Sequence, residues 1–360
     1  MVSNSVSGVR RGANPAWTVW LVVALVLGGA AGAEAARQFE GEVIRLQVWG
    51  GPEGEMVQKH AVKPFEEATG AKVITEFGYT SASVAKLRAQ KNDPQLDLVM
   101  FDDIGVVTAE REGLLEPLDL KKIPNAADIP GKFVFGDKGI GMYVYLNALA
   151  YSKQALKEPP KSWRVIWDPK YTGKVILPAI DATSIFKILI MASLLNGGDQ
   201  KNMEPGFAAM ARLKPNIHSL EKNTAVIAEN LRNGEASIAA WQVAIMKPYI
   251  DQGYPIGVTI QLEEGIFGTP GCVSIVKGYK AKRPVLEAFI NRVLSPEAQA
   301  GFARDFWHSP TNRKVAIPRE LQNVSLPAEG SSVKLVPVDL DHFYQNKAQW
   351  LDRLSKTLLQ

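Results

Sequence analysis

The fold of this chain is decided by residues 43–101, which read VIRLQVWGGPEGEMVQKHAVKPFEEATGAKVITEFGYTSASVAKLRAQKNDPQLDLVMF. In VIRLQVW (43–49), Ile44, Leu46 and Val48 recur at every second position, which indicates a strand with one buried face. The elements that follow alternate between helix and strand. Helices are expected at 56–69, 83–91 and 106–112, where Gly70 and Gly113 end the first and the last, and strands at 72–77 and 96–101. This alternation predicts an α/β fold with a largely parallel, doubly wound sheet.

A second series of strands and helices fills the other half of the chain. The chain has 360 residues, which is long for one domain, and its 46% hydrophobic content suits a sizeable core. We therefore expect two lobes. The expected strands of this series are 174–177, 236–241, 256–262 and 272–276, and the expected helices are 183–195, 224–232, 284–294, 296–306 and 342–359.

Charge, cysteine and histidine usage exclude several classes of function. The formal net charge is only +4, and no dense Lys/Arg block occurs, so no nucleic-acid partner is expected. The chain has a single cysteine, Cys272, which rules out an internal disulfide. Its four histidines are scattered without ligand spacing. We expect no metal and no cofactor, and a monomer.

The N-terminus resembles an export signal. Arg10 and Arg11 precede an apolar run at 17–29, and Ala33-Glu34-Ala35 fits a small-x-small cleavage site. We therefore predict a signal peptide over residues 1–35, cleaved near Ala35, and a periplasmic location. The alternative is an uncleaved membrane anchor, and the choice between the general and twin-arginine export routes stays open.

Polar and aromatic residues follow several of the expected strands. In open parallel sheets, ligands bind beyond the carboxyl ends of strands, next to helix N-termini. This rule selects residues 49–51, 102–103, 181–184 and 241–242, which come from both halves of the chain. Together they predict one cleft between two lobes.

Several motifs resemble the solute-binding proteins of ABC importers. They are VKPFEEATGAKV (62–73), LDLV (96–99), SW (162–163) with WDPKYTGKV (167–175), LSPEAQ (294–299) and SPTN (309–312). The resemblance covers nearly all of the chain beyond the leader. It is strongest to the spermidine/putrescine-type group, which has iron-, thiamine- and phosphonate-binding relatives.

The resemblance implies a type II periplasmic binding protein-like fold, with two doubly wound lobes joined by two crossover strands near Tyr145–Ala148 and Phe267–Gly271. Lobe 1 would comprise 40–146 and 269–313, and lobe 2 would comprise 147–268 and 314–360. The lobes would close on a small organic solute and deliver it to a membrane permease.

The resemblance also suggests roles for particular residues. Trp49 and Trp241 fall on aromatic residues that stack on a polyamine, Asp181 on a carboxylate that pairs with an ammonium group, Asp102 on a polar contact and His308 on an aromatic residue. Ser184, Gly268 and Pro270 replace a Glu, a Trp and an Asp of the polyamine pattern. Fewer carboxylates favour a singly cationic or zwitterionic solute over a long polyamine. The candidate ligand-binding residues are Trp49, Gly50, Gly51, Asp102, Asp103, Tyr143, Asp181, Thr183, Ser184, Trp241, Thr269 and His308.

Structural roles and other functions compete with this interpretation. Trp49 and Trp241 also suit a core, and Asp102, Asp103 and Asp181 also suit helix caps. An exported enzyme on the same scaffold would need a catalytic pair. Glu263-Glu264 does not provide one, because neighbours on a strand point to opposite faces. We expect no catalytic residues, although an exported enzyme and a solute-presenting sensory partner remain alternatives.

Overall fold

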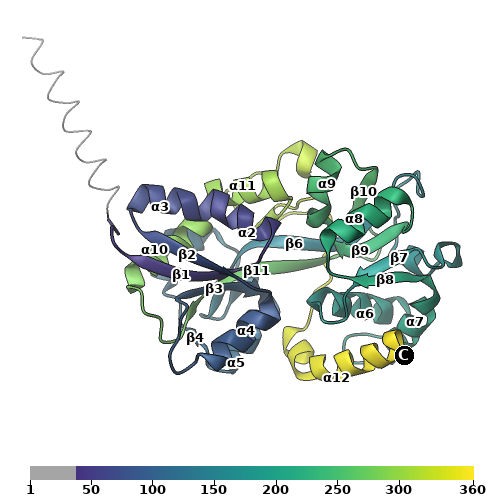
Figure 1. Cartoon of the computed structure of the whole chain (residues 1–360), viewed down its shortest axis with the longest axis horizontal. Coiled ribbons are helices and arrows are strands. Elements are labelled where there is room, and N and C mark those ends of the chain that lie inside the picture. The colour runs from purple at the N-terminus through teal and green to yellow at the C-terminus, as the bar shows by residue number, and fades with distance from the viewer. Residues whose placement is uncertain (1–37) are drawn as a thin grey trace, which may run out of the picture.

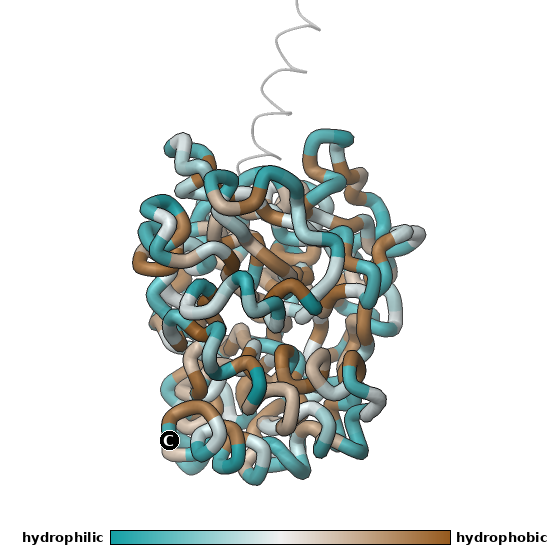
Figure 2. Tube along the Cα trace, turned by 90° about the vertical axis from the view of Figure 1, so that its right-hand side faces the viewer, coloured by the Kyte–Doolittle hydropathy of each residue, from teal (hydrophilic) through white to brown (hydrophobic). Residues whose placement is uncertain are grey.

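The structure, a computed structural model, describes residues 38–360. The expected signal peptide, residues 1–35, lies outside the described residues. The described chain forms two α/β lobes side by side, which are joined by long strands through the middle (Figure 1). Hydrophobic segments gather in the interior and hydrophilic ones at the periphery (Figure 2). Among residues 38–360, no helix combines the length and the apolar character needed to cross a membrane.

The central sheet runs through both lobes in the order β2-β1-β3-β11-β6-β9-β7-β8. The lobe 1 strands pair in parallel with one another, as do those of lobe 2. This confirms the doubly wound arrangement expected for each lobe. The lobe strands are β1 (Val43–Val48), β2 (Lys72–Phe77) and β3 (Leu98–Asp102), then β7 (Val175–Pro178), β8 (Ile217–Glu221) and β9 (Ile238–Gln242).

Two long strands cross between the lobes, as predicted. β6 (Gly139–Ser152) is buried along its whole length and lies antiparallel to β11 (Phe267–Val276). β11 pairs with β3 of lobe 1, whereas β6 pairs with β9 of lobe 2. Because each crossover strand belongs to both halves of the sheet, a bend in these strands changes how the lobes face each other. Shorter strands complete the sheet: β4 (Leu115–Glu116), β5 (Val134–Phe135), β10 (Ile256–Thr259) and β12 (Ser309–Pro310).

Helices cover both faces of the sheet (Figure 1). The expected helix at 56–69 starts earlier, at Pro52, and contains a π-helical turn at Gln58–Val62. Gly70 ends it with a φ of 75°, in the left-handed region that favours glycine. The α-helices are α2 (Pro52–Val57), α3 (Lys63–Thr69), α4 (Thr80–Ala89), α5 (Asp103–Arg111), α6 (Thr183–Leu195), α7 (Glu204–Leu213), α8 (Thr224–Asn233), α9 (Lys247–Asp251), α10 (Arg283–Val293), α11 (Pro296–Phe306) and α12 (Leu340–Leu359).

The C-terminal helix α12 contacts both lobes. Lys347 Nζ donates to Thr108 Oγ1 of α5 at 3.2 Å, and Arg111 of α5 pairs with Asp341. Toward lobe 2, Phe343 packs edge-on against Phe186 of α6, with ring centroids 5.0 Å apart. A helix that touches both lobes is placed to respond to their relative motion. The lobe boundaries given above, including 314–360 in lobe 2, stay a prediction.

Candidate ligand-binding site

Polar side chains from several elements meet where the lobes face each other. From lobe 1 come the end of β3 and the start of α5, and from lobe 2 come the first turns of α6. The crossover strands β6 and β11 supply the remaining residues. Residues on α6 that are three or four positions apart share one face of the helix, so its polar residues point the same way. The residues that meet are Asp102, Asp103, Tyr145, Asn147, Thr183, Ser184, Lys187 and Thr269.

A hydrogen-bond network ties α6 to the crossover strands. Asn147 Nδ2 donates to Thr269 Oγ1 at 3.1 Å, and Ser184 Oγ donates to Asn147 Oδ1 at 3.0 Å. Lys187 Nζ also donates to Thr269 Oγ1. All four side chains are buried. Buried polar groups that satisfy one another in this way hold a fixed geometry, which is what a binding site requires.

Asp102 links the two lobes. Its backbone N–H donates to Thr80 Oγ1 at 3.1 Å, which secures it within lobe 1. Its Oδ2 accepts a hydrogen bond from Thr183 Oγ1 of lobe 2 at 3.3 Å. The Tyr145 hydroxyl on β6 also hydrogen-bonds this carboxylate. One buried carboxylate therefore receives hydrogen bonds from lobe 2 and from a crossover strand.

Burial dominates the electrostatics of the site. It raises the pKa of Asp102, and it raises that of Asp103 to about 6, with repulsion from Asp102 adding to the rise and Lys187 opposing it. Burial likewise raises the pKa of Glu53 to about 7 and lowers that of Lys187. Between the lobes, two carboxylates thus face one ammonium group. The pair of carboxylates therefore has one cationic partner fewer than its number.

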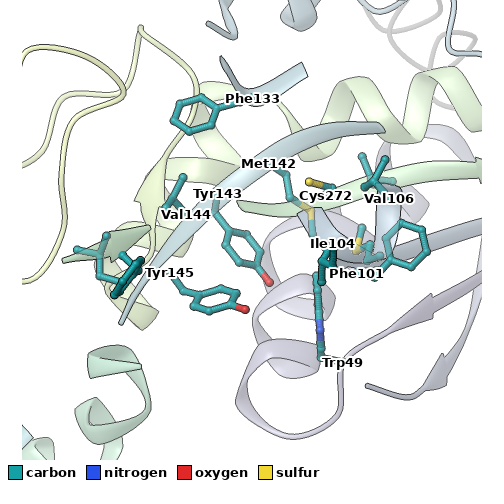
Figure 3. Packing of buried hydrophobic residues seen from close by; sticks show 14 of the residues in the cluster. Trp49, Phe101, Ile104, Val106, Phe133, Met142, Tyr143, Val144, Tyr145 and Cys272 are labelled. Atoms are coloured by element: carbon teal, nitrogen blue, oxygen red, sulfur yellow. The ribbon is translucent and has the colours of Figure 1, made fainter. Parts of the chain in front are cut away.

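Aromatic rings form a wall beside the polar network. Tyr143 lies between His308 and Trp49, with ring centroids 4.3 Å and 6.0 Å apart. Tyr143 and Tyr145 project from the same side of β6, whereas Val144 projects from the opposite side (Figure 3). Burial lowers the pKa of His308 to about 3, so its ring is neutral at pH 7. The wall offers apolar contact to the hydrocarbon part of a solute.

A small pocket of about 20 Å³ lies at the polar network, roughly the volume that holds a single water molecule. Asp102, Asp103, Thr183, Lys187 and Thr269 line it, together with apolar side chains of α6 and α12. Asp102 of lobe 1 and Thr183 of lobe 2 both line this pocket and hydrogen-bond to each other, so the lobes are in contact here.

The structure brings together most of the residues selected from the sequence. Asp102, Asp103, Thr183, Ser184 and Thr269 belong to the polar network. Trp49, Tyr143 and His308 form the aromatic wall, and Gly50 and Gly51 follow Trp49 in the loop before α2.

Two selected residues lie apart from the network. The Asp181 side chain is 68% exposed and lies 3.8 Å from Lys222. Trp241 is half-buried at the end of β9 and packs against a separate apolar cluster of lobe 2. Their roles in binding stay predictions.

Three network residues, Tyr145, Asn147 and Lys187, are absent from the candidate ligand-binding residues. A signal for Lys187 exists, because it is the only charged residue in the helix TSIFKILIMASLL (183–195). A lone charge in a helix this apolar needs a buried partner. Asn147 similarly interrupts the apolar strand β6.

Comparison with known proteins identifies the family. The pattern of the family described as "Bacterial extracellular solute-binding protein" matches residues 60–327. The chain belongs to this family. Proteins of this family are the solute-binding components of ABC importers. They bind small solutes and a membrane permease.

Relatives of this solute-binding protein include the spermidine/putrescine-binding periplasmic protein of Escherichia coli. The two are 24% identical over 332 residues, which cover 88% of this chain and 92% of the relative. The corresponding protein of Salmonella typhimurium is 23% identical over 333 residues and covers similar shares, 88% and 91%. These relatives are solute-binding proteins rather than enzymes, and they are periplasmic.

Solved structures share the fold of this solute-binding protein. An ABC transporter substrate-binding protein from Bradyrhizobium japonicum superimposes with a TM-score of 0.76 at 18% identity, covering 88% of this chain and all of that one, 100%. The binding protein MotA from A. tumefaciens, in complex with glucopine, gives a TM-score of 0.74 at 18% identity, covering 87% and 99%. At sequence identities this low, the superpositions show a shared fold only.

Proposed function

We propose that this solute-binding protein captures a small amine-bearing or zwitterionic organic solute between its lobes and delivers it to an ABC permease. The observation that carries the proposal is the charge of the site. Asp102 and Asp103 lie between the lobes, and Lys187 is the one ammonium group within residues 38–360 whose charge is found to act on both. A ligand ammonium group would supply the missing positive charge.

The apolar part of the solute would contact the aromatic wall. Trp49 and Tyr143 lie near each other beside the carboxylates, so one solute can touch both kinds of surface. Closure then follows from differential binding. Only the closed form brings Thr183 of lobe 2 to Asp102 of lobe 1, so a solute held by groups from both lobes stabilises that form.

The proposed role includes no bond chemistry. Its support is that the relatives named above are solute-binding proteins, and that the network consists of groups which bind and orient. Mass spectrometry of a bound compound after long incubation tests this point, because conversion of the compound would show an enzyme.

We further propose export to the periplasm with cleavage near Ala35, and a monomeric state. N-terminal sequencing and size-exclusion chromatography of the exported protein check these two points.

Calorimetry across a panel of solutes tests the proposal. The panel comprises monoamines, diamines, amino acids, phosphonates and aromatic acids, each titrated into the protein cleared of bound solute by partial unfolding and refolding. We expect at least one amine or zwitterion to bind with a Kd in the micromolar range, which corresponds to about −8 kcal/mol. X-ray scattering with that solute should show a smaller radius of gyration. Binding of anions only, or no change in scattering, contradicts the proposal.

A further inference from the structure

Lys187 stands in an environment that suits a bound ammonium group. Its side chain is 8% exposed, so its charge is almost fully removed from water. Nζ donates to Thr269 Oγ1 and lies 5.3 Å from the centroid of the Tyr145 ring. Hydroxyl oxygens and aromatic faces are the groups with which proteins hold ligand cations.

Carboxylates complete this environment. Asp103 and Asp102 are the charged groups whose fields favour the ionised form of Lys187. Both act on Lys187 through their charge, without a hydrogen bond to it. Lys187 therefore shares the field of both carboxylates without being held by either.

We propose that Lys187 is a resident cation that takes the place of one ligand ammonium group, so that the site accepts solutes with a single ammonium group and rejects diamines. This inference rests on the proposed function, since it names which amines the same site selects. A tethered ammonium group is always present, whereas a dissolved one must be captured from water.

Diamines are rejected because the second ammonium group of the solute and the Lys187 ammonium group repel each other in a buried site of low dielectric. The carboxylates of Asp102 and Asp103 balance two cations, and Lys187 is already one of those two cations. A second ligand ammonium group would be left without a counter-charge near Lys187, and an unpaired buried charge is strongly unfavourable. Ser184, on the same face of α6, hydrogen-bonds Asn147 and offers no carboxylate. Glu53 is a third carboxyl group, but burial raises its pKa to about 7, and it is not among the groups that act on Lys187.

The test compares butylamine with 1,4-diaminobutane, which differ by one ammonium group on the same carbon chain. Calorimetry at pH 7 is run on wild type, Lys187→Met, Lys187→Gln and Lys187→Arg. Lys174→Met is the matched control, because Lys174 donates to Gly234 O at 3.0 Å in lobe 2, away from the network, and its loss changes the net charge equally. Thermal unfolding of each variant establishes that it is folded.

We expect wild type to bind butylamine more tightly than diaminobutane. Lys187→Met and Lys187→Gln should each gain affinity for diaminobutane by at least about tenfold, because the added ammonium group now finds the place that Lys187 held. Lys187→Arg keeps the charge and should gain no affinity for diaminobutane, whereas Lys174→Met should bind both amines like wild type.

Three results decide the inference. If the wild-type protein binds diaminobutane more tightly than butylamine, the inference is wrong, whatever the variants show. Folded neutral variants that gain nothing for diaminobutane also overturn it, while the proposed function stands if wild type binds butylamine or an amino acid. If wild type binds no amine, the proposed function fails, yet a gain of diaminobutane binding in Lys187→Met still supports the resident cation.

Discussion

Replacing Asp102 by asparagine separates binding from stability. Asparagine keeps the size of the side chain and an oxygen that can accept the hydrogen bond from Thr183, but it removes the negative charge. The backbone contact to Thr80 is unaffected, because the donor there is the main-chain N–H. The substitution therefore changes the charge of the site with little change of shape.

The expected effect on binding is large. Removing one partner of a buried ion pair costs about 3–5 kcal/mol. Asp103 stays close and shares the ligand charge, so we take the lower limit, which raises Kd about a hundredfold. The effect on folding has the opposite sign. Because burial raises the pKa of Asp102, its ionised form lowers the stability of the folded protein at pH 7, and the neutral asparagine should keep or raise the melting temperature.

Calorimetry with the tightest-binding amine of the panel, together with thermal unfolding, measures both quantities. Asp128→Asn is the control, since Asp128 is half-buried, pairs with Lys314 at 2.7 Å and lies outside the network. We expect it to leave Kd unchanged. An Asp102→Asn protein with unchanged Kd would refute the reasoning, as would one whose weaker binding merely follows a lower melting temperature.

Two further predictions follow from the geometry, and a third, on Trp241, follows from the resemblance to polyamine-binding proteins. Amine affinity should fall about tenfold between pH 7 and pH 5, because Asp103, with a pKa of about 6, must be ionised to pair with the cation; calorimetry at both pH values checks this, and a flat profile contradicts it. Trp163→Phe should lower the free energy of unfolding by about 2–3 kcal/mol, since the fully buried indole N–H donates to Gly265 O at 2.7 Å. Urea denaturation measures that loss, and a change below about 0.5 kcal/mol would count against a structural role. Trp241→Ala should weaken solute binding with little loss of stability, and unchanged affinity would remove Trp241 from the site.

Local sequence signals predicted the individual elements well. The helix at 296–306 has the predicted bounds, and its N-cap Ser295 accepts at Oγ from the backbone N–H of Ala298 at 3.2 Å. The strand Ile217–Glu221 and the helix Glu204–Leu213 were missed. The strand carries no clear alternation, and its parallel pairing with β7 is a long-range contact that no local pattern encodes.

The candidate site was predictable where strand ends define it. Asp102 and Asp103 follow a buried strand, so the rule for parallel sheets selects them directly. Lys187 was not predicted because its partners, Thr269 and the two aspartates, are about 80 residues away in the sequence, in either direction, and meet it only in the folded chain. A helical pattern shows that Lys187 shares a face with Thr183, but not what that face meets.

The most direct test of an interlobe amine site is a crystal structure of the protein with the solute that co-purifies with it. We expect a solute enclosed between the lobes, with a nitrogen within hydrogen-bonding distance of Asp102 or Asp103. A second cavity, of about 200 Å³, lies on the Val144 side of β6, lined by Phe133, Leu146 and Pro310. A solute bound there, with Asp102 and Asp103 untouched, would contradict the account.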